Sequence, residues 1–228
     1  MSELGVVIVT GGASGLGRAI AQGVADHGGT PVVLDINDPP DDFESERLDL
    51  AKARDTEAAV RRVADRHGGL HAVVTAAGTD SCGMLADIDP EAWERVIAVN
   101  LLGTAAVVRA ALPYLERSSG RVVTVASTLG LRALSDATAY CASKFGVVGF
   151  SRALAAETAG RVGVTCLIPG GMQTAFFDGR EERYKPPPDA DLAPPGEVAD
   201  AVLFALTRPY RAEVRELVVC PSRESSWP

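Results

Sequence analysis

The pair Tyr140 and Lys144 is the chain's clearest candidate for proton-transfer chemistry. Both residues lie in the stretch 139–154, whose small and apolar side chains predict a helix packed on both sides. Residues four apart lie one above the other on a helix face, so a phenol and an ammonium become neighbours. A fixed cation favours the phenolate, and the spacing therefore predicts a lowered pKa for Tyr140 and a general base. A buried tyrosine beside a lysine that snorkels from a core helix would show the same spacing.

The length and composition of the chain indicate one α/β domain with a large aliphatic core. Of its 228 residues, 46% are hydrophobic but only 5% are aromatic, which suits helices packed closely on a parallel sheet. The formal net charge of −8 argues against nucleic-acid or anionic-membrane partners, because no basic run offsets the acidic residues. The apolar run near the N-terminus is too short for a signal or spanning segment.

The four cysteines, Cys82, Cys141, Cys166 and Cys220, have neither C-x-x-C spacing nor a histidine cluster nearby. This pattern indicates no metal site and no redox motif. Free thiols are typical of a reducing compartment, so we expect a cytoplasmic protein.

A glycine-rich turn between a strand and a helix predicts a phosphate-binding site. The β-branched run 5–10 predicts a buried strand, and the pattern of 18–27 predicts a helix. Glycines between them let the backbone approach a pyrophosphate, and the helix N-terminus supplies free N–H groups and a positive dipole end. A glycine turn without a ligand is the alternative. The residues expected to contact a dinucleotide here are Gly11, Ser14, Gly15, Leu16 and Gly17.

Asp35 ends the next predicted strand, 30–34, and lies 18 residues beyond Gly17. A dinucleotide-binding fold places an acidic residue there to accept hydrogen bonds from the adenosine ribose. The carboxylate would repel a 2′-phosphate, and no Arg or Lys occurs in 36–45, so NAD is favoured over NADP. A solvent-exposed aspartate that opens a turn is the alternative.

Strands and helices alternate through the rest of the chain, which predicts a doubly wound parallel sheet of about seven strands with helices on both faces. We expect a single Rossmann-type domain over 1–228. Further strands are predicted around 47–48 and over 69–77, 121–126, 162–168 and 214–219, and further helices over 53–67, 90–115, 139–154 and 197–206.

The candidate residues follow one another in a fixed order, which is Thr10-Gly11-x-x-x-Gly15-x-Gly17, Asp35, Asp49, Ala77-Gly78, Asn100, Ser127, Tyr140-x-x-x-Lys144 and Pro169-Gly170. Over nearly the whole chain this set resembles the short-chain dehydrogenase/reductase family. The resemblance implies a nicotinamide cofactor, hydride transfer to or from a small-molecule alcohol or carbonyl, and a homodimer or homotetramer.

The resemblance also implies roles for individual residues. Ser127 precedes Tyr140 by 13 residues, the family's spacing for a catalytic serine, and Asn100 matches an asparagine that holds a water linking the lysine to solvent. Ser127 would donate to the substrate oxygen and Lys144 would bond the nicotinamide ribose. A helix-interior asparagine bonded to a nearby carbonyl is the alternative for Asn100. Further cofactor contacts are implied for Asp49, Leu50, Ala77, Gly78, Pro169, Gly170 and Thr174, although Asp49 also suits the acidic first turn of a helix.

The sequence departs from the family pattern after the fourth predicted strand, where Thr75 and Ala76 replace two asparagines. The Thr75 hydroxyl could supply part of the lost bonding. A short substrate lid is expected over 171–195, with a partly apolar pocket formed by Met172, Phe176, Leu129 and Leu134. Trp227, near the end of the chain, is expected to pack on a neighbouring subunit.

The expected function is an NAD-dependent oxidoreductase that interconverts a secondary alcohol and a ketone or aldehyde, with Tyr140 as general acid and base. A 3-oxoacyl-thioester reductase is an alternative, but it would favour NADPH and a basic docking patch, which the acidic chain does not support. A non-catalytic NAD-binding sensor is the other alternative. The complete set of Asn100, Ser127, Tyr140 and Lys144 argues against a sensor, which has no need of all four.

Overall fold

The computed structural model describes residues 4–209, 212–224 and 226. Within them one parallel sheet of seven strands has the order β3-β2-β1-β4-β5-β6-β7. The expected doubly wound fold is thereby confirmed. The strands are β1 (Val6–Thr10), β2 (Thr30–Asp35), β3 (Glu44–Arg47), β4 (Ala72–Thr75), β5 (Arg121–Val125), β6 (Gly163–Pro169) and β7 (Glu216–Val219).

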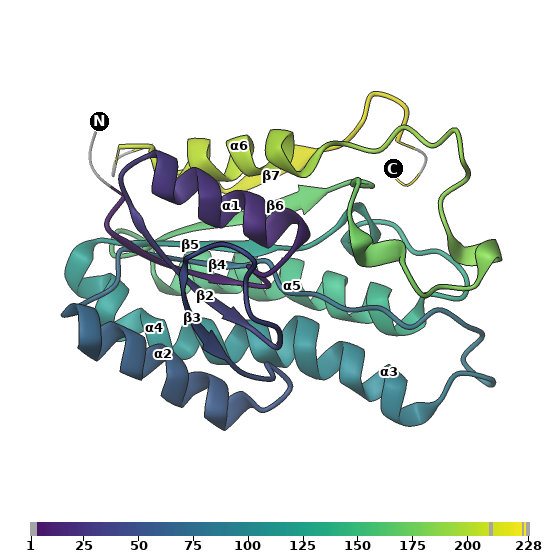
Figure 1. Ribbon diagram of the computed structural model, residues 1–228, viewed down its shortest axis with the longest axis horizontal. Helices are drawn as coiled ribbons and strands as arrows, with labels where there is room; N and C mark the ends of the chain where they lie inside the picture. The colour runs from purple at the N-terminus through teal and green to yellow at the C-terminus, as the bar shows by residue number, and fades with distance from the viewer. Residues whose placement is uncertain (1–3, 210–211, 225, 227–228) are drawn as a thin grey trace.

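Helices cover both faces of the sheet (Figure 1). On one face α1 (Gly15–Asp26) and α6 (Pro195–Leu206) pack together. On the other face lie α2 (Ala53–His67), α4 (Thr104–Ser118) and α5 (Thr138–Glu157). The remaining helical segments are α3 (Pro90–Ile97), the π-helix η1 (Ala98–Gly103), and three 3₁₀ turns, η2 (Thr128–Gly130), η3 (Ala175–Phe177) and η4 (Glu182–Tyr184).

Two aliphatic clusters, one on each face, hold the layers to the sheet. Ile8 and Val73 point to the side of α2 and α4, whereas Val7 and Val9 point to the side of α1 and α6. All four side chains are fully buried. Continuous apolar strands of this kind are stable only where helices cover both faces, since successive side chains point to opposite sides.

Parallel pairing brings the carboxyl ends of the central strands side by side. Thr10 at the end of β1 lies opposite Leu34 of β2 and Thr75 of β4. Ligand sites of open α/β sheets lie at this edge, where the strand order reverses. The order reverses between β1 and β4, so the connections that follow these two strands leave the sheet on opposite sides. The glycine turn after β1 and the segment 76–79 after β4 therefore border a crevice at this edge.

Two element predictions differ from the structure for physical reasons. The strand expected around 47–48 is Glu44–Arg47, a charged edge strand that pairs only with β2 and therefore lacks a buried apolar pattern. The helix expected over 90–115 is continuous from 90 to 118, but the π-helix Ala98–Gly103 interrupts its α-helical hydrogen bonding. By length and composition alone Pro90–Ser118 could cross a membrane, yet 56% of its apolar window is buried inside the fold.

Candidate active site

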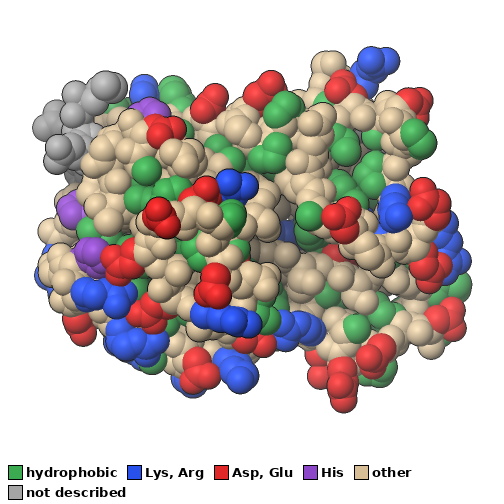
Figure 2. Space-filling model, in the orientation of Figure 1, with side chains coloured by type: hydrophobic (Ala, Val, Ile, Leu, Met, Phe, Trp, Pro, Cys, Tyr) green, Lys and Arg blue, Asp and Glu red, His purple; other side chains and the backbone are tan. Residues whose placement is uncertain are grey.

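A cleft of about 1430 Å³ runs along the carboxyl ends of the strands and is lined from both halves of the chain. Figure 2 shows a hollow near the middle of the molecule, with apolar side chains gathered on the right-hand half beside it. Asn100 lies behind the wall of the cleft and is only 1% exposed. The other predicted site residues line the cleft, namely Gly11, Ser14, Gly15, Leu16, Gly17, Asp35, Asp49, Leu50, Ala77, Gly78, Ser127, Tyr140, Lys144, Pro169, Gly170 and Thr174.

The glycine turn leaves bare backbone where a pyrophosphate would lie. Gly11 has a φ of 71°, and a Cβ on it would come within 2.7 Å of the Ala77 Cα atom. A Cβ on Gly17 would overlap the carbonyl oxygen of Gly11. Because α1 begins at Gly15, its free N–H groups face this bare surface. These residues fit the diphosphate of a dinucleotide.

Asp35 lines the cleft at the end of β2, and its contact with an adenosine ribose stays a prediction. Its carboxylate accepts hydrogen bonds from the Ala13 N–H at 3.0 Å and the Asn37 N–H at 2.9 Å. These two bonds join the glycine turn to the end of β2 and fix the position of the carboxylate. Lone pairs remain on both oxygens to accept ribose hydroxyls.

Two arginines that sequence patterns did not assign to the site lie near Asp35. The Arg18 guanidinium bonds Asp41 at 2.6 Å, and the Arg47 Nε atom donates to the carbonyl of Ile36 at 2.9 Å. Sequence reasoning examined only 36–45 for cations. The edge strand β3 brings Arg47 back beside the end of β2, which no local pattern predicts.

The Asp49 carboxylate is hydrogen-bonded to groups of the protein itself. It accepts from the Ala51 N–H at 3.0 Å and from Arg95 at 3.1 Å. Burial raises the pKa of Asp49, but these hydrogen bonds outweigh that effect and the pKa is lowered. Helix α2 begins at Ala53 and its acidic first-turn residue is Asp55, so the alternative of a helix-terminal acid is wrong for Asp49, which lines the cleft.

Ser127 and Tyr140 meet at the far end of the cleft from Asp35. Ser127 follows β5 and its side-chain oxygen accepts from the Leu129 N–H at 3.1 Å, which fixes the start of η2. Burial raises the pKa of Tyr140 above its usual value, while a side-chain hydrogen bond with Ser127 opposes that rise. The predicted lowering of the Tyr140 pKa is thus wrong for the protein's own groups, because burial outweighs the neighbouring charges.

Lys144 lies one helical turn below Tyr140, with its Nζ atom 5.5 Å from the centre of the tyrosine ring. The ammonium donates to the Val125 carbonyl at 2.9 Å and is 4% exposed. Burial lowers the pKa of Lys144 to about 8. Lys144 is therefore held beside the phenol by the end of β5, which excludes the snorkelling alternative.

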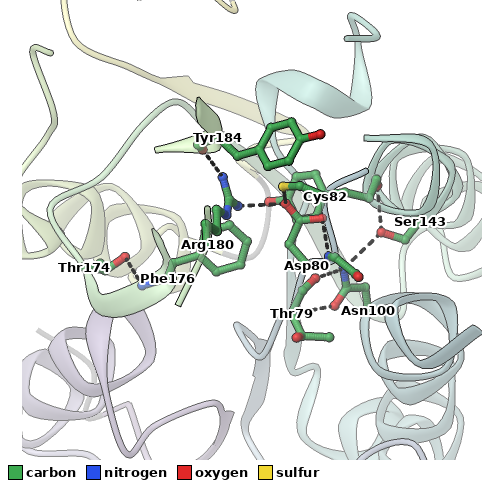
Figure 3. Close-up of polar contacts among 11 residues, drawn as sticks. Thr79, Asp80, Cys82, Asn100, Ser143, Thr174, Phe176, Arg180 and Tyr184 are labelled. Carbon is green, nitrogen blue, oxygen red and sulfur yellow. Dashed lines mark hydrogen bonds and ion pairs between the residues drawn. The ribbon is translucent and has the colours of Figure 1, made fainter. Parts of the chain in front are cut away.

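Asn100 supports the site from the π-helix. Its Oδ1 atom accepts from the Thr79 N–H at 2.8 Å, and its Nδ2 atom donates to the Thr79 carbonyl at 2.9 Å and to Ser143 at 3.0 Å (Figure 3). The Thr104 hydroxyl bonds the Asn100 backbone carbonyl at 2.8 Å. Asn100 thus fixes the segment after β4 against α5. Its role in a water relay stays a prediction.

Threonine bonding after β4 differs from the expectation. Among the described residues the buried Thr75 hydroxyl has no hydrogen-bond partner, so it does not replace an asparagine amide. Thr10 does part of this work, since its hydroxyl accepts from the Ala77 N–H at 3.1 Å. Thr10 pairs in register with Thr75 on the neighbouring strand. The sequence alone did not predict that Thr10 would make this bond.

The segment after β6 is held by residues near the C-terminus. The Glu224 carboxylate accepts from the Gly171 N–H at 2.7 Å, and the Ser226 hydroxyl bonds the Thr128 hydroxyl at 2.6 Å. Thr174 caps η3 by accepting from the Phe176 N–H at 3.3 Å. The described tail therefore packs on its own chain. The predicted contact of Trp227 with another subunit lies outside the described residues.

The lid brings an ion pair to the substrate end that sequence reasoning did not find. Arg180 bonds Asp80 at 2.7 Å, and its guanidinium lies against the rings of Phe176 and Phe177 (Figure 3). Phe176 also lies 5.6 Å, between ring centres, from Tyr140. Asp80 could have been suspected from its place just after β4, but nothing in the sequence pairs it with Arg180.

The predicted pocket residues Met172, Leu129 and Leu134 line the same end of the cleft as Phe176. Leu134 is 47% exposed at the rim. The site therefore combines a cradle for a dinucleotide with a polar triad and a partly apolar pocket. This arrangement could transfer a proton to or from a small molecule beside a bound cofactor.

The sequence profile of the family described as short chain dehydrogenase matches residues 5–185. An uncharacterized oxidoreductase from Staphylococcus aureus (strain MRSA252) is 31% identical over 228 aligned residues, which cover 95% of this chain and 96% of that protein.

Solved structures agree. The ligand-free aldohexose dehydrogenase of Thermoplasma acidophilum has a TM-score of 0.86 at 27% identity, with 94% of this chain and 92% of that one covered. An alcohol dehydrogenase from the archaeon Thermococcus sibiricus, complexed with 5-hydroxy-NADP, has a TM-score of 0.83 at 26% identity, with 94% and 95% covered. Sequence, fold and site geometry lead to one conclusion: the chain belongs to the short-chain dehydrogenase/reductase family.

Proposed function

We propose that this oxidoreductase interconverts a secondary alcohol and a ketone or aldehyde, using NAD and Tyr140 as general acid and base. The observation that carries the proposal is the meeting of Ser127, Tyr140 and Lys144 at the end of a cleft whose other end is a glycine cradle. Bound NAD would accept the hydride from the alcohol carbon. Every other step falls to the chain's own groups.

Tyr140 takes the hydroxyl proton of the alcohol in oxidation and returns it in carbonyl reduction. The Ser127 hydroxyl bonds Tyr140 and carries a single proton; with substrate bound it would instead donate that proton in a hydrogen bond to the substrate oxygen, where negative charge develops in the transition state. The buried ammonium of Lys144 favours the phenolate over the phenol, and its anchorage on Val125 keeps it in place. Burial lowers the pKa of Lys144, and an anionic phenol beside it would favour its charged form.

The choice of NAD rests on Asp35. Its fixed carboxylate suits ribose hydroxyls and would repel a 2′-phosphate. Arg18 and Arg47 are nearby, but each faces an aspartate, at 2.6 Å for Asp41 and 3.9 Å for Asp38. These pairs reduce the positive potential available to a phosphate, so we favour NAD although the Thermococcus relative was solved with a derivative of NADP.

We also propose a cytoplasmic homodimer or homotetramer. The four cysteines are free thiols. Leu102 in η1 and Phe145 in α5 are 52% and 45% exposed on helices of one face, which supports association with a second copy.

The test is the variant Tyr140→Phe, compared with Tyr114→Phe on α4 as a matched control. A panel of secondary alcohols, hydroxysteroids, hydroxyacyl thioesters and sugars would be screened with NAD by NADH fluorescence. With any active substrate, Tyr140→Phe should lower kcat by about 10³-fold because proton transfer is lost. NADH binding, measured by titration calorimetry, should change by less than about twofold in both variants.

An active Tyr140→Phe enzyme would refute the proposed mechanism. A wild-type protein that binds NADH but turns over no substrate of the panel would favour the sensor alternative. Tyr114 bonds Asp65 at 2.9 Å on the surface of α4, so its loss should leave kcat unchanged.

A further inference from the structure

Arg180 is committed to protein partners on several sides. Its Nη2 atom donates to Asp80 at 2.7 Å and its Nη1 atom donates to the Tyr184 carbonyl at 3.3 Å. The guanidinium carbon lies 4.9 Å from the ring centre of Phe176 and 4.7 Å from that of Phe177. Planar stacking combined with hydrogen bonds from two separate Nη atoms suits arginine and not lysine, while the buried Nε atom has no hydrogen-bond partner among the described residues. Figure 3 shows the side chain extending from the lid toward Asp80.

The Asp80 carboxylate that binds this arginine is itself held in place by further hydrogen bonds. Its carboxylate also accepts from the Ser81 N–H at 2.7 Å and from the Cys82 thiol at 3.3 Å. The residue before it, Thr79, is held on both backbone groups by Asn100. The position of Arg180 is therefore set, through Asp80, by the same helix turn that supports the catalytic site.

Burial makes this pair unlike the other ion pairs of the lid, Arg183 with Glu181 and Lys185 with Glu182. The side chains of Arg180 and Asp80 are 17% and 6% exposed, whereas those of Arg183 and Glu181 are both 68% exposed. Charges in water are screened and their pairs contribute little. Removal of one partner from a buried pair instead leaves an uncompensated charge, which is strongly destabilising locally.

The pair acts on Tyr140 in two ways. Through Phe176 it sets a ring that lies 5.6 Å from the tyrosine ring. Its two charges act in opposite directions, because Asp80 raises the pKa of Tyr140 and Arg180 lowers it. The other groups that face the phenol are Ser127 after β5 and, on α5 itself, Cys141 and Lys144.

We propose that Arg180 and Asp80 are positioning residues for the reaction, which hold Phe176 as one wall of the substrate pocket and, as one ion pair, oppose each other's charge effect on the phenol of Tyr140. This inference rests on the proposed function, since it assumes that Tyr140 transfers the proton. Neither residue needs to touch substrate. The ion pair thereby links the lid to the segment after β4. It fixes the position of Phe176 and also changes the electrostatic potential at Tyr140.

The experiment compares Asp80→Asn, Arg180→Met, the double variant and the lid control Arg183→Met. For alcohol oxidation, kcat/KM rises with pH as Tyr140 loses its proton. Asp80→Asn removes the charge that raises the tyrosine pKa, so this rise should move to lower pH. Arg180→Met should move it to higher pH, so the two single variants should shift the profile in opposite directions. The double variant should return toward wild type, and Arg183→Met should match wild type.

A lid that only packs would not give this pattern. Shifts of both single variants in the same direction, or unshifted profiles in an active enzyme, would overturn the electrostatic balance. The variant Arg180→Lys separates the two effects, because it retains the charge and should keep the profile while loosening the lid.

Hydrogen exchange of residues 175–185 in the protein without added cofactor supplies a readout that needs no turnover. We expect at least tenfold faster exchange in Asp80→Asn, Arg180→Met and Arg180→Lys, but not in Arg183→Met. Wild-type exchange rates in these variants would refute the positioning role. If wild type binds NADH but has no activity, the proposed function fails and the exchange result still decides whether the pair holds the lid.

Discussion

The cofactor side and the substrate side of this cleft are built by different means. On the cofactor side, the bond from Ala13 to Asp35 spans 22 residues, and bare backbone forms the cradle. On the substrate side, the pair Asp80 and Arg180 spans 100 residues, and Glu224 reaches Gly171 across 53. The first side is built mainly of backbone turns, with long-range bonds such as Ala77 to Thr10 beside them, whereas the second depends on side chains that meet only in the finished fold.

From this difference we expect the cofactor side to tolerate less change than the substrate side. A backbone cradle excludes any Cβ at its closest points, so the residue type itself is fixed there. A side-chain contact such as Arg180 with Asp80 can be replaced by another pair without altering the sheet. Substrate choice can therefore change while cofactor binding is kept.

The largest effect should come from Gly17→Ala on the cofactor side. The added Cβ would overlap the Gly11 carbonyl, so the turn must shift and NADH affinity should fall by at least about 100-fold, with a loss of roughly 2 to 4 kcal/mol in unfolding free energy. Calorimetric titration and urea unfolding measure both. Gly196→Ala, in the first turn of α6, is the control: nothing lies within 4 Å of its Cβ position, so stability should change by less than about 0.5 kcal/mol. Equal effects of the two variants would contradict the steric argument.

A smaller effect is expected for Asp35→Ser at the adenosine end. Loss of the carboxylate removes the bonds to ribose and the repulsion of a 2′-phosphate, so the ratio of NAD to NADP affinity should fall by about 100-fold. Fluorescence titration with NADH and NADPH gives this ratio. Asp42→Ser, an exposed neighbour, should leave it unchanged. An unaltered ratio in Asp35→Ser would shift the source of selectivity to Arg18 and Arg47.

The smallest effect should come from Glu224→Gln on the substrate side. Burial raises the pKa of Glu224, but its hydrogen bonds with Ser226 and Gly171 outweigh this and lower it. A lowered folded-state pKa stabilises the fold above the unfolded pKa and loses that contribution as pH falls through the folded pKa. At pH 7 the variant should lower Tm by about 1 to 3 °C, and the difference should vanish once pH has fallen through the lowered folded-state pKa of Glu224.

Differential scanning fluorimetry across pH measures this difference, with Ser222→Ala, an exposed tail residue, as control. A Tm difference that is independent of pH would assign the effect to packing and not to the carboxylate. A kcat/KM loss of more than about tenfold would show that the substrate side is as sensitive as the cofactor side, against the comparison above.

The sequence predicted most of the fold and the line of motif residues, because both depend on local patterns. Apolar runs identified the central strands, and strand ends placed Gly11, Asp35 and Ser127 at one edge. For β3 it predicted a strand around 47–48 and not its bounds Glu44–Arg47, because a charged edge strand has no buried apolar pattern. It also gave the wrong direction for the Tyr140 pKa, since the extent of burial depends on Phe176 and the lid and is not encoded in the spacing to Lys144.

The substrate side could not be predicted for a related reason. Asp80 and Arg180 each have an ordinary sequence context, and only the folded lid makes them partners. The same is true of Ser226 and Thr128, which meet across 98 residues. Long-range side-chain pairs leave no periodic signal in a single sequence.

The π-helix Ala98–Gly103 gives one continuous helix two different orientations. An extra residue in a turn rotates everything before it relative to everything after it. Because of this rotation α3 can pack against α5 while α4 packs against α2 and β4, although both belong to the same uninterrupted helix of residues 90–118. A deletion of one residue here would restore regular winding and turn the inward stripe of α3 away from α5. The π-helix thus sets the rotation of α3 relative to α4. An insertion or deletion of a residue here would change that rotation, whereas a loop of variable length would absorb it.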